Sequence, residues 1–157
     1  MPSWCENWLL IWSEDKPVQD YIDSWRAISQ DPGLAFSLTS IVPMPGGIWD
    51  YDWCIVNWGT KWDTYDVKIE ILDEHQGRIR FSTAWSPPLT AVEALSLRHP
   101  ELELILDFGD PDNDFAGRLV GSEGVMEQTE VPNCSPFAEW YRQACSHEDE
   151  DDIDQEG

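Results

Sequence analysis

The sequence predicts an α+β fold with a split βαβ arrangement, in which two helices cover one face of an antiparallel sheet. Two observations predict it: segments of strand length alternate apolar and polar residues, and two longer segments repeat apolar residues at spacings of three and four. An extra hairpin strand and a short C-terminal helix are expected to follow. At 157 residues, the chain suits one domain with a core of ordinary size.

The first predicted strand and helix come early in the chain. Residues 5–12 are apolar with a rough period of two and end at a polar break, which is typical of a strand. Pro17 suits the first helical position, and the apolar residues after it are spaced by three and four, so we expect a helix over residues 17–30. Its apolar face consists of Val18, Ile22, Trp25 and Ile28.

A short strand and a long loop are predicted next. Residues 34–38 alternate as a strand, and Pro43 and Pro45 favour a sheet edge or an exit from the sheet. Residues 46–56 are expected to form a loop, and loops of this length tend to be functional or well packed. The loop carries Trp49, Tyr51 and Trp53.

The clearest hairpin lies in the middle of the chain. Residues 67–71 and 79–83 alternate on either side of a turn at residues 73–77. A second helix is expected to start near Ser86 and to end before Pro100, because serine caps helices and proline stops them.

The second half of the chain predicts one more hairpin and one more helix. Residues 102–108 alternate as a strand, and residues 115–120 can return as its partner after an Asp-rich turn. A last short helix is expected to start at Ser135, with Phe137, Trp140, Tyr141 and Ala144 on its apolar face. We expect the sheet face opposite the two main helices to be exposed and acidic.

These elements divide the chain into three parts. Residues 1–125 form the sheet-and-helix domain, and residues 126–146 form a helical extension packed on it. Residues 147–157 form an acidic tail that we expect to be disordered when free.

The net charge limits the partners of the chain. The sequence has 31 acids and 9 bases, a net charge of −22, and removing the seven acids of residues 148–157 still leaves −15. Such a charge repels nucleic acids and anionic membranes and attracts basic surfaces, so we expect no direct nucleic-acid or membrane binding. A solvated acidic surface that serves only solubility is the alternative.

No motif predicts an enzyme, a metal site or a cofactor. The four cysteines contain no Cys-x-x-Cys pair, and no apolar run approaches the roughly 20 residues that span a bilayer, so the chain reads as a cytosolic protein with reduced thiols. Asp110-x-Asp112-x-Asp114 begins like a calcium loop, but Phe115 stands where that loop needs glycine. A polar turn is the favoured interpretation.

Residues 57–63 and 83–88 follow neither a helical nor a strand period. Their tryptophans Trp58, Trp62 and Trp85 would each need a partner for the indole N–H if buried. Lys61 and Asp63 are near enough in sequence to pair. Two interpretations stay open: a packed aromatic corner, and a pocket lined by these residues that takes a ligand or partner.

Four segments of the chain resemble the signature of the YubB ferredoxin-like family. These are Trp4-Cys5-x-Asn7, Ile41-Val42-Pro43-Met44-Pro45, Asn57-Trp58-Gly59-Thr60-Lys61-Trp62-Asp63 and Thr83-Ala84-Trp85-Ser86-Pro87-Pro88. The resemblance runs to about residue 120. It implies a small protein of bacteriophages and conjugative plasmids that acts in the bacterial cytosol, with no catalytic residues and no iron–sulfur cluster.

We therefore expect an inhibitor of bacterial defence machinery that mimics nucleic acid and blocks a basic nucleic-acid-binding site. Its targets would be host proteins such as CRISPR effectors, restriction enzymes or other nucleases. The candidate carboxylates are Glu70, Asp73, Glu74, Asp107, Asp110, Asp112 and Asp114. The candidate anchors are Trp49, Tyr51, Trp53, Trp58, Lys61, Trp62, Trp85 and Trp140.

The alternative function is a regulatory module that binds a small molecule or a peptide. Its pocket would be formed by Trp58, Lys61, Trp62 and Trp85. Salt separates the two functions, because mimicry predicts binding that weakens steeply with ionic strength. The sequence leaves the oligomeric state open.

Overall fold

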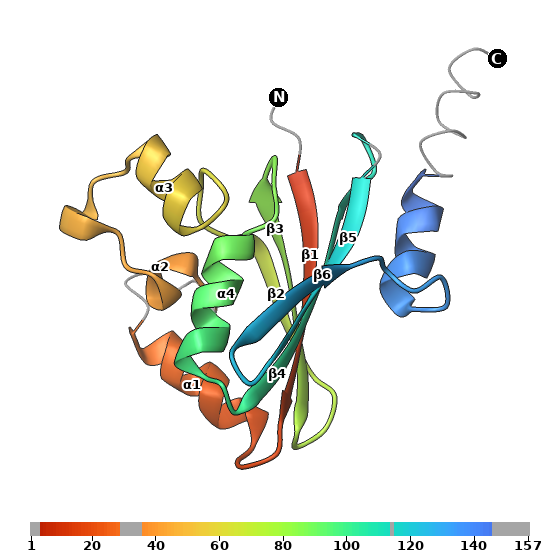
Figure 1. Cartoon of the computed structure of the whole chain (residues 1–157), viewed down its shortest axis with the longest axis horizontal. Coiled ribbons are helices and arrows are strands. Elements are labelled where there is room, and N and C mark those ends of the chain that lie inside the picture. Colours follow the sequence, from red (N-terminus) through yellow and green to blue (C-terminus); the bar gives the residue numbers. More distant parts are fainter. Residues whose placement is uncertain (1–3, 29–35, 114, 146–157) are drawn as a thin grey trace.

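The computed structural model of the chain describes residues 4–28, 36–113 and 115–145 (Figure 1). Six strands form one antiparallel sheet in the order β2-β3-β1-β4-β5-β6. An α+β fold with an antiparallel sheet is therefore confirmed. The strands are β1 (Trp4–Ser13), β2 (Tyr65–Ile71), β3 (Gln76–Ala84), β4 (Leu102–Asp110), β5 (Phe115–Ser122) and β6 (Val125–Thr129).

The central strand β1 organises the core. It pairs with β3 from Trp4↔Ala84 to Trp12↔Gln76, and with β4 along its other edge. Because side chains alternate along a strand, Cys5, Leu9 and Ile11 all point to one face, where each is fully buried.

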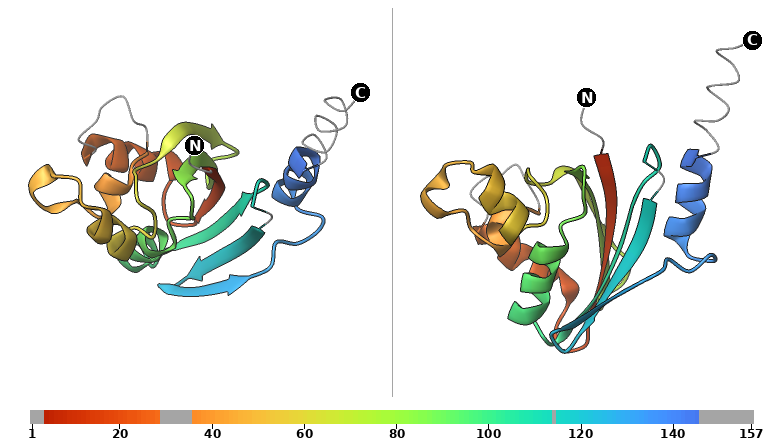
Figure 2. Two further views of the ribbon diagram at one scale, coloured as in Figure 1. Left: turned by 90° about the horizontal axis from the view of Figure 1, so that it is seen from above. Right: turned by 45° about the horizontal axis from the view of Figure 1, so that its top comes forward.

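Within the described residues, four helices cover that face (Figure 2). They are α1 (Val18–Ile28), α2 (Leu38–Ile41), α3 (Tyr51–Asn57) and α4 (Leu89–Arg98), with a short 3-10 turn, η1 (Pro45–Gly47), before α3. The helix over residues 136–145 lies on the opposite side of the sheet (Figures 1 and 2). There Phe137 meets the ring of Trp8 edge to face, with 5.4 Å between ring centroids.

Most of the predicted elements are confirmed. The strand over residues 5–12, the helix starting at Pro17, the central hairpin and the helix before Pro100 correspond to β1, α1, β2–β3 and α4. The last hairpin and the short C-terminal helix also form. Ser86 does not cap α4, because its hydroxyl donates to the Gly59 carbonyl at 2.7 Å instead.

Two predictions between residues 34 and 56 are wrong. The expected strand over residues 34–38 is a bend leading into α2, where Ser37 is the N-cap and accepts from the Ser40 N–H at 3.1 Å; residues 34 and 35 lie outside the described part. Most of the expected loop over residues 46–56 is helical, because it includes the end of η1 and nearly all of α3. Asp50 caps that helix by accepting from the Trp53 N–H at 3.1 Å.

The sheet also extends one strand further than predicted. The sequence predicts one returning strand after β4, but β6 adds to β5 through pairs from Ser122↔Val125 to Arg118↔Thr129. Four of its five residues are exposed. With no buried alternation, the segment carries no pattern that marks a strand.

Candidate partner-binding surface

Hydrogen bonds join the four segments singled out in the sequence into one cluster. The Trp58 indole N–H donates to the Val42 carbonyl at 2.9 Å, and Trp58 is only 2% exposed. The Thr60 hydroxyl donates to the Ala84 carbonyl at 2.8 Å. At the start of β1, the Asn7 amide donates to the Thr83 hydroxyl at 2.9 Å. Trp58 thus belongs to the core and is not available to a ligand.

Gly59 lets the chain turn tightly against the start of α4. Its φ is +89°, a conformation that favours glycine, and a Cβ there would lie 3.1 Å from the Leu89 nitrogen and 3.3 Å from the Pro87 oxygen. The Gly59 carbonyl accepts from the Ser86 hydroxyl at 2.7 Å. This contact holds residues 57–63 against residues 83–88.

The Asp63 carboxylate forms hydrogen bonds within the domain. Its carboxylate accepts from the Leu38 N–H at 2.6 Å, from the Thr39 hydroxyl at 2.8 Å and from the Thr64 N–H at 2.7 Å. It therefore adds to the Ser37 cap of α2 by accepting from the first N–H group of that helix, 25 residues away. The expected pairing of Asp63 with Lys61 does not form.

Lys61 lies between two tryptophans. Its Nζ is 4.2 Å from the ring centroid of Trp62 and 3.6 Å from that of Trp85, both within cation–π range. Trp4 stacks on Tyr65 at 5.2 Å and tilts against Trp62 at 6.3 Å. We call the five residues Trp4, Lys61, Trp62, Tyr65 and Trp85 the aromatic patch.

The patch is exposed and partly strained. Trp62, Tyr65 and Trp85 are 39%, 62% and 51% exposed. Trp85 has φ +68°, which is uncommon for a residue with a Cβ and unfavourable by about 1–2 kcal/mol. The bonds of Ser86 to Gly59 and of Thr60 to Ala84 hold the backbone on either side of it.

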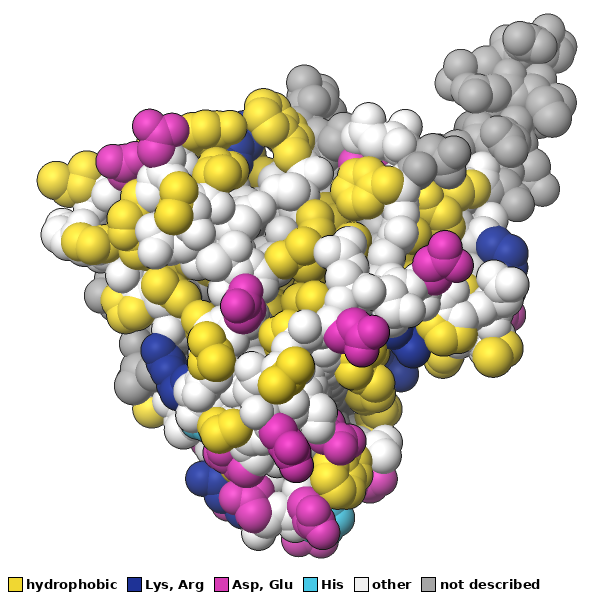
Figure 3. Space-filling model, in the orientation of Figure 1, with side chains coloured by type: hydrophobic (Ala, Val, Ile, Leu, Met, Phe, Trp, Pro, Cys, Tyr) yellow, Lys and Arg dark blue, Asp and Glu magenta, His cyan; other side chains and the backbone are white. Residues whose placement is uncertain are grey.

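Trp49 and Tyr51 extend this surface toward α3. The Trp49 indole N–H donates to the Lys61 carbonyl at 2.8 Å, and the Trp49 and Tyr51 rings meet edge to face at 6.5 Å. Hydrophobic side chains gather around α3 on the surface, with carboxylates beside them (Figure 3). The exposed carboxylates on this helix are Asp50 and Asp52.

The comparison with protein families adds independent evidence about the fold. A family model described as the ferredoxin-like domain in Api92-like protein matches residues 54–153. The chain belongs to this family.

A solved structure has the same fold. The crystal structure of a protein api92 from Yersinia pseudotuberculosis superposes with a TM-score of 0.54 at 16% identity. The match covers 63% of this Api92-like chain and 40% of the Yersinia chain. A search of curated proteins gives no match. At that identity the likeness shows the fold alone.

The family match agrees with the prediction of a ferredoxin-like fold, and it covers a different range of residues from the sequence resemblance. The description of the matched family does not include the YubB name or an origin in phages or plasmids. It names a fold and no activity. The match also runs to residue 153, past residue 120, where the sequence resemblance ends. The C-terminal segment of this Api92-like domain therefore belongs to the family.

The candidate carboxylates near the β4–β5 turn are mostly engaged within the domain. Asp107 is 8% exposed and pairs with Arg118, whose Nη2 donates to Oδ2 at 2.8 Å. Asp110 is fully buried and accepts from the Asp112 N–H at 3.0 Å. Asp112 is exposed, and Asp114 lies outside the described residues.

The carboxylates of the β2–β3 hairpin lie at the other end of the sheet. Glu70 pairs with two arginines of β3, at 3.4 and 3.6 Å, while Asp73 and Glu74 are exposed on the turn. This turn meets β1 at Ser13, whereas Asp110 follows Gly109, the register partner of Glu6, about 20 Å away along the strand. The six candidates that the structure describes do not form one surface.

The sheet face opposite α1 to α4 is not acidic. Arg78, Arg80 and Arg118 share that face with Trp8, because they occupy register positions in line with it. Arg80 lies 4.3 Å and Arg78 5.3 Å from the Trp8 ring centroid. With Glu70 beside them, these residues make the face a mixture of charges, and the prediction of an acidic face is wrong.

Two of the predicted anchors lie apart from the aromatic patch. Trp140, on the helix over residues 136–145, packs against Trp8 at 6.0 Å, on the other side of the sheet. Trp53 is half-buried on α3, where its ring meets Trp58 edge to face at 5.4 Å. The patch members that the sequence did not single out as anchors are Trp4 and Tyr65.

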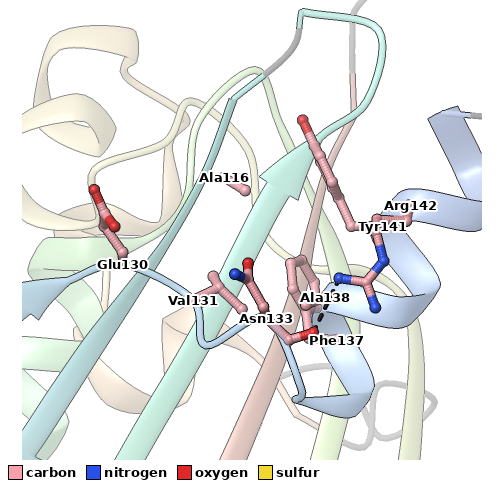
Figure 4. Close-up of a pocket in the computed structure, with 8 residues that line it drawn as sticks. All are labelled: Ala116, Glu130, Val131, Asn133, Phe137, Ala138, Tyr141 and Arg142. Atoms are coloured by element: carbon pink, nitrogen blue, oxygen red, sulfur yellow. Dashed lines mark hydrogen bonds between the residues drawn. The ribbon is translucent and has the colours of Figure 1, made fainter.

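Cavities open at three or more places on the described surface. One of about 330 Å³ lies between β5 and the helix over residues 136–145, where Arg142 turns back to donate to the Asn133 carbonyl at 2.9 Å (Figure 4). Another, of about 400 Å³, lies at the Ser13 end of the sheet and is lined by Trp12 and five carboxylates. The third, of about 250 Å³, lies beside Trp49 and Trp53.

No group of three or more potential metal ligands occurs within residues 4–28, 36–113 and 115–145. Within the same ranges, no helix has the length and apolar content needed to cross a bilayer.

Proposed function

We propose that this Api92-like domain is an acidic protein-binding module that docks its aromatic patch on a basic, nucleic-acid-handling protein of the bacterial host and thereby blocks the nucleic-acid site. The observation that carries the proposal is Trp85, an exposed tryptophan in a left-handed backbone conformation. Such strain persists only where the surrounding structure holds it, and it clusters at binding sites.

The composition of the patch favours a protein partner. Tryptophan and tyrosine are the residue types that dominate binding energy at protein interfaces, and they contribute most where a partner excludes water from them. Lys61 orders the rings of Trp62 and Trp85 before any partner arrives. A pre-ordered surface loses less side-chain entropy on binding.

The charge distribution favours a basic partner. Most of the nine lysines and arginines contact groups of the domain itself: Lys16 lies over Tyr21, Arg98 donates to carbonyls of α2, and Arg118 pairs with Asp107. The excess of carboxylates therefore dominates the field around the molecule. That field speeds the approach of basic surfaces, and the aromatic patch supplies the specific contact.

The finer assignments belong to the same proposal. The strand order β2-β3-β1-β4 with α1 and α4 supports a split βαβ arrangement for residues 4–110, with β5 and β6 added to it. We assign the partner to bacterial defence machinery and the site of action to the host cytoplasm, on the sequence resemblance to phage and plasmid proteins. The domain acts by occupying a site and not by catalysis.

Affinity capture tests the proposal. The full chain is immobilised, and nuclease-treated lysate from bacteria that carry defence systems is passed over it. We expect the wild type to retain a basic nucleic-acid-binding protein that DNA or RNA displaces and that elutes as the Debye length falls from about 10 Å to about 3 Å. The double variant Trp62→Ala/Trp85→Ala should not retain it, whereas Leu97→Ala, at an exposed apolar position on α4, should.

Two outcomes count against the proposal. In the first, no basic nucleic-acid-binding protein is retained by the wild type. In the second, the double variant retains the same protein as well as the wild type does, which would place the contact outside the aromatic patch.

The alternative function, a regulatory module for a small molecule or a peptide, has one supporting observation. The cavity beside Trp49 and Trp53 has walls suited to an apolar or cationic group. It does not use Trp58, which is buried in the core. A ligand-dependent change that is insensitive to salt would favour this function.

A further inference from the structure

The cavity beside α3 combines aromatic walls with a carboxylate. It has a volume of about 250 Å³ and is lined by Met44, Pro45, Ile48, Trp49, Asp50 and Trp53. Apart from Asp50, every lining residue is apolar, so the cavity is a hydrophobic space with one negative charge at its wall.

The groups that line it are held in place before any ligand binds. The Trp49 indole N–H donates to the Lys61 carbonyl, which sets the direction of a ring that is 52% exposed. Trp53 packs edge to face on the buried Trp58. Asp50 Oδ1 accepts from the Trp53 N–H, and its Oδ2 has no hydrogen bond within the described part of the chain.

Aromatic faces with a carboxylate bind organic cations. A cation over the face of a tryptophan is attracted by the ring, and a carboxylate adds a charge-assisted hydrogen bond. The neighbouring patch shows the same chemistry with a cation of the chain itself, since the Lys61 ammonium lies 3.6 Å from the Trp85 ring centroid. A neutral apolar ligand would not give Oδ2 of Asp50 a hydrogen-bond donor.

The charges around the cavity favour a cation as well. Asp50 and Asp52 are both exposed at the start of α3. Their two negative charges exceed the partial positive charge of about one half at a helix N-terminus. The net charge of −22 acts in the same direction.

We propose that the cavity formed by Trp49, Asp50 and Trp53 binds a single lysine or arginine side chain, with its stem against the rings and its charged end at Asp50. The inference rests on the proposed function, because the cation is one presented by the basic partner docked on the adjacent aromatic patch. It adds the chemical identity of one contact, which the patch alone does not give.

Indole N–H signals in two-dimensional ¹H–¹⁵N spectra test the site directly. The full chain is titrated with N-acetyl-arginine methylamide and N-acetyl-lysine methylamide, with N-acetyl-norleucine methylamide as the neutral control. We expect both cationic probes to shift the signals of Trp49 and Trp53, assigned through Trp49→Phe and Trp53→Phe. The signal of buried Trp58 should stay in place, and the norleucine probe should cause at most a small shift.

A matched pair of variants tests the carboxylate. Asp50→Asn removes the charge and keeps α3 capped, since asparagine and aspartate are comparable N-caps. We expect it to weaken cation binding about tenfold, the effect of losing roughly 1.4 kcal/mol. Asp52→Asn removes the same charge from the same helix outside the cavity and should leave binding within about twofold.

The possible results separate the inference from the proposed function. The inference would be overturned if the cationic probes caused no shift, or if the norleucine probe caused an equal shift. It would also be overturned if Asp50→Asn and Asp52→Asn weakened cation binding equally. A captured partner that binds Asp50→Asn as tightly as the wild type would overturn it too. Cation binding at the cavity without capture of any basic host protein would leave the cavity assigned and reject the proposed function.

Discussion

Trp58 and Trp85 lie in two segments that two side-chain hydrogen bonds, from Ser86 to Gly59 and from Thr60 to Ala84, hold together, yet they have opposite environments. Trp58 is 2% exposed, and its indole N–H is bonded to Val42. Trp85 is 51% exposed, has a left-handed backbone and contacts the Lys61 ammonium. The comparison teaches that residue type does not separate packing from binding in this cluster. Backbone conformation and the partner of each indole do.

The largest expected effect breaks the buried side of this comparison. Trp58→Ala removes a fully packed ring and leaves a cavity, so we expect the free energy of unfolding to fall by about 3–5 kcal/mol. Trp62→Ala removes an exposed ring and should lower it by less than about 1 kcal/mol. Urea unfolding followed by far-UV circular dichroism measures both. Equal losses would mean that the patch is part of the core.

A second, smaller effect tests the turn that separates the two tryptophans. Gly59→Ala adds a Cβ at φ +89° within 3.1 Å of the Leu89 nitrogen, so we expect a loss of about 2–4 kcal/mol. Gly46→Ala is the matched control. Gly46 has φ +69° with nothing within 4 Å of the added Cβ. It therefore carries only the conformational cost, about 1–2 kcal/mol. If the free energy of unfolding falls equally in both variants, the close approach of Gly59 to α4 does not contribute to stability.

At the exposed residue Trp85, one substitution is expected to be more stable than another. Trp85→Gly removes the strain at φ +68°, whereas Trp85→Ala keeps it, so the glycine variant should be more stable by about 0.5–1 kcal/mol. Both variants should lose the captured partner to the same extent. Thermal unfolding of the pair measures the difference. A glycine variant less stable than the alanine variant would show that the backbone at Trp85 is unstrained.

The smallest effect concerns Glu6, two residues from Trp4 in the patch. Burial raises the pKa of Glu6 above its usual 4.5, against a hydrogen bond from Ser82 and the charge of Arg80, which lower it. The folded state therefore holds the proton more tightly than the unfolded state does. The associated stability is present below about pH 4.5 and is lost as the pH rises through the folded-state pKa.

Glu6→Gln removes this dependence and keeps an acceptor for the Ser82 hydroxyl. We expect the stability of the variant, relative to the wild type, to rise as the pH increases from 4.5 to 7, which unfolding curves at a series of pH values would show. A relative stability that falls over this range would mean that Arg80 outweighs burial.

The fold was predictable where the pattern is local. The alternation along β1 to β4 and the spacing in α1 and α4 come from burial on one face, which the sequence records directly. By contrast, α2 has only four residues and its first N–H group donates to Asp63, 25 residues away, while α3 has seven residues after its N-cap Asp50. Neither is long enough to show a period.

The candidate site was predictable only in its residue types. Trp49, Lys61, Trp62 and Trp85 do lie near one surface, as their unusual segments suggested. The burial of Trp58 depends on a carbonyl 16 residues earlier, and no local pattern shows that contact. The density of carboxylates along the chain says nothing about which end of the sheet each carboxylate reaches.

The affinity of a captured partner for the patch variants tests the central claim most directly. The dissociation constant is measured for the wild type and for Trp62→Ala/Trp85→Ala at one salt concentration, with the urea midpoint of each. We predict at least tenfold weaker binding by a variant whose midpoint is nearly unchanged, because interface tryptophans contribute about 2 kcal/mol or more. Unchanged affinity, or a loss that appears only together with unfolding, would contradict the account.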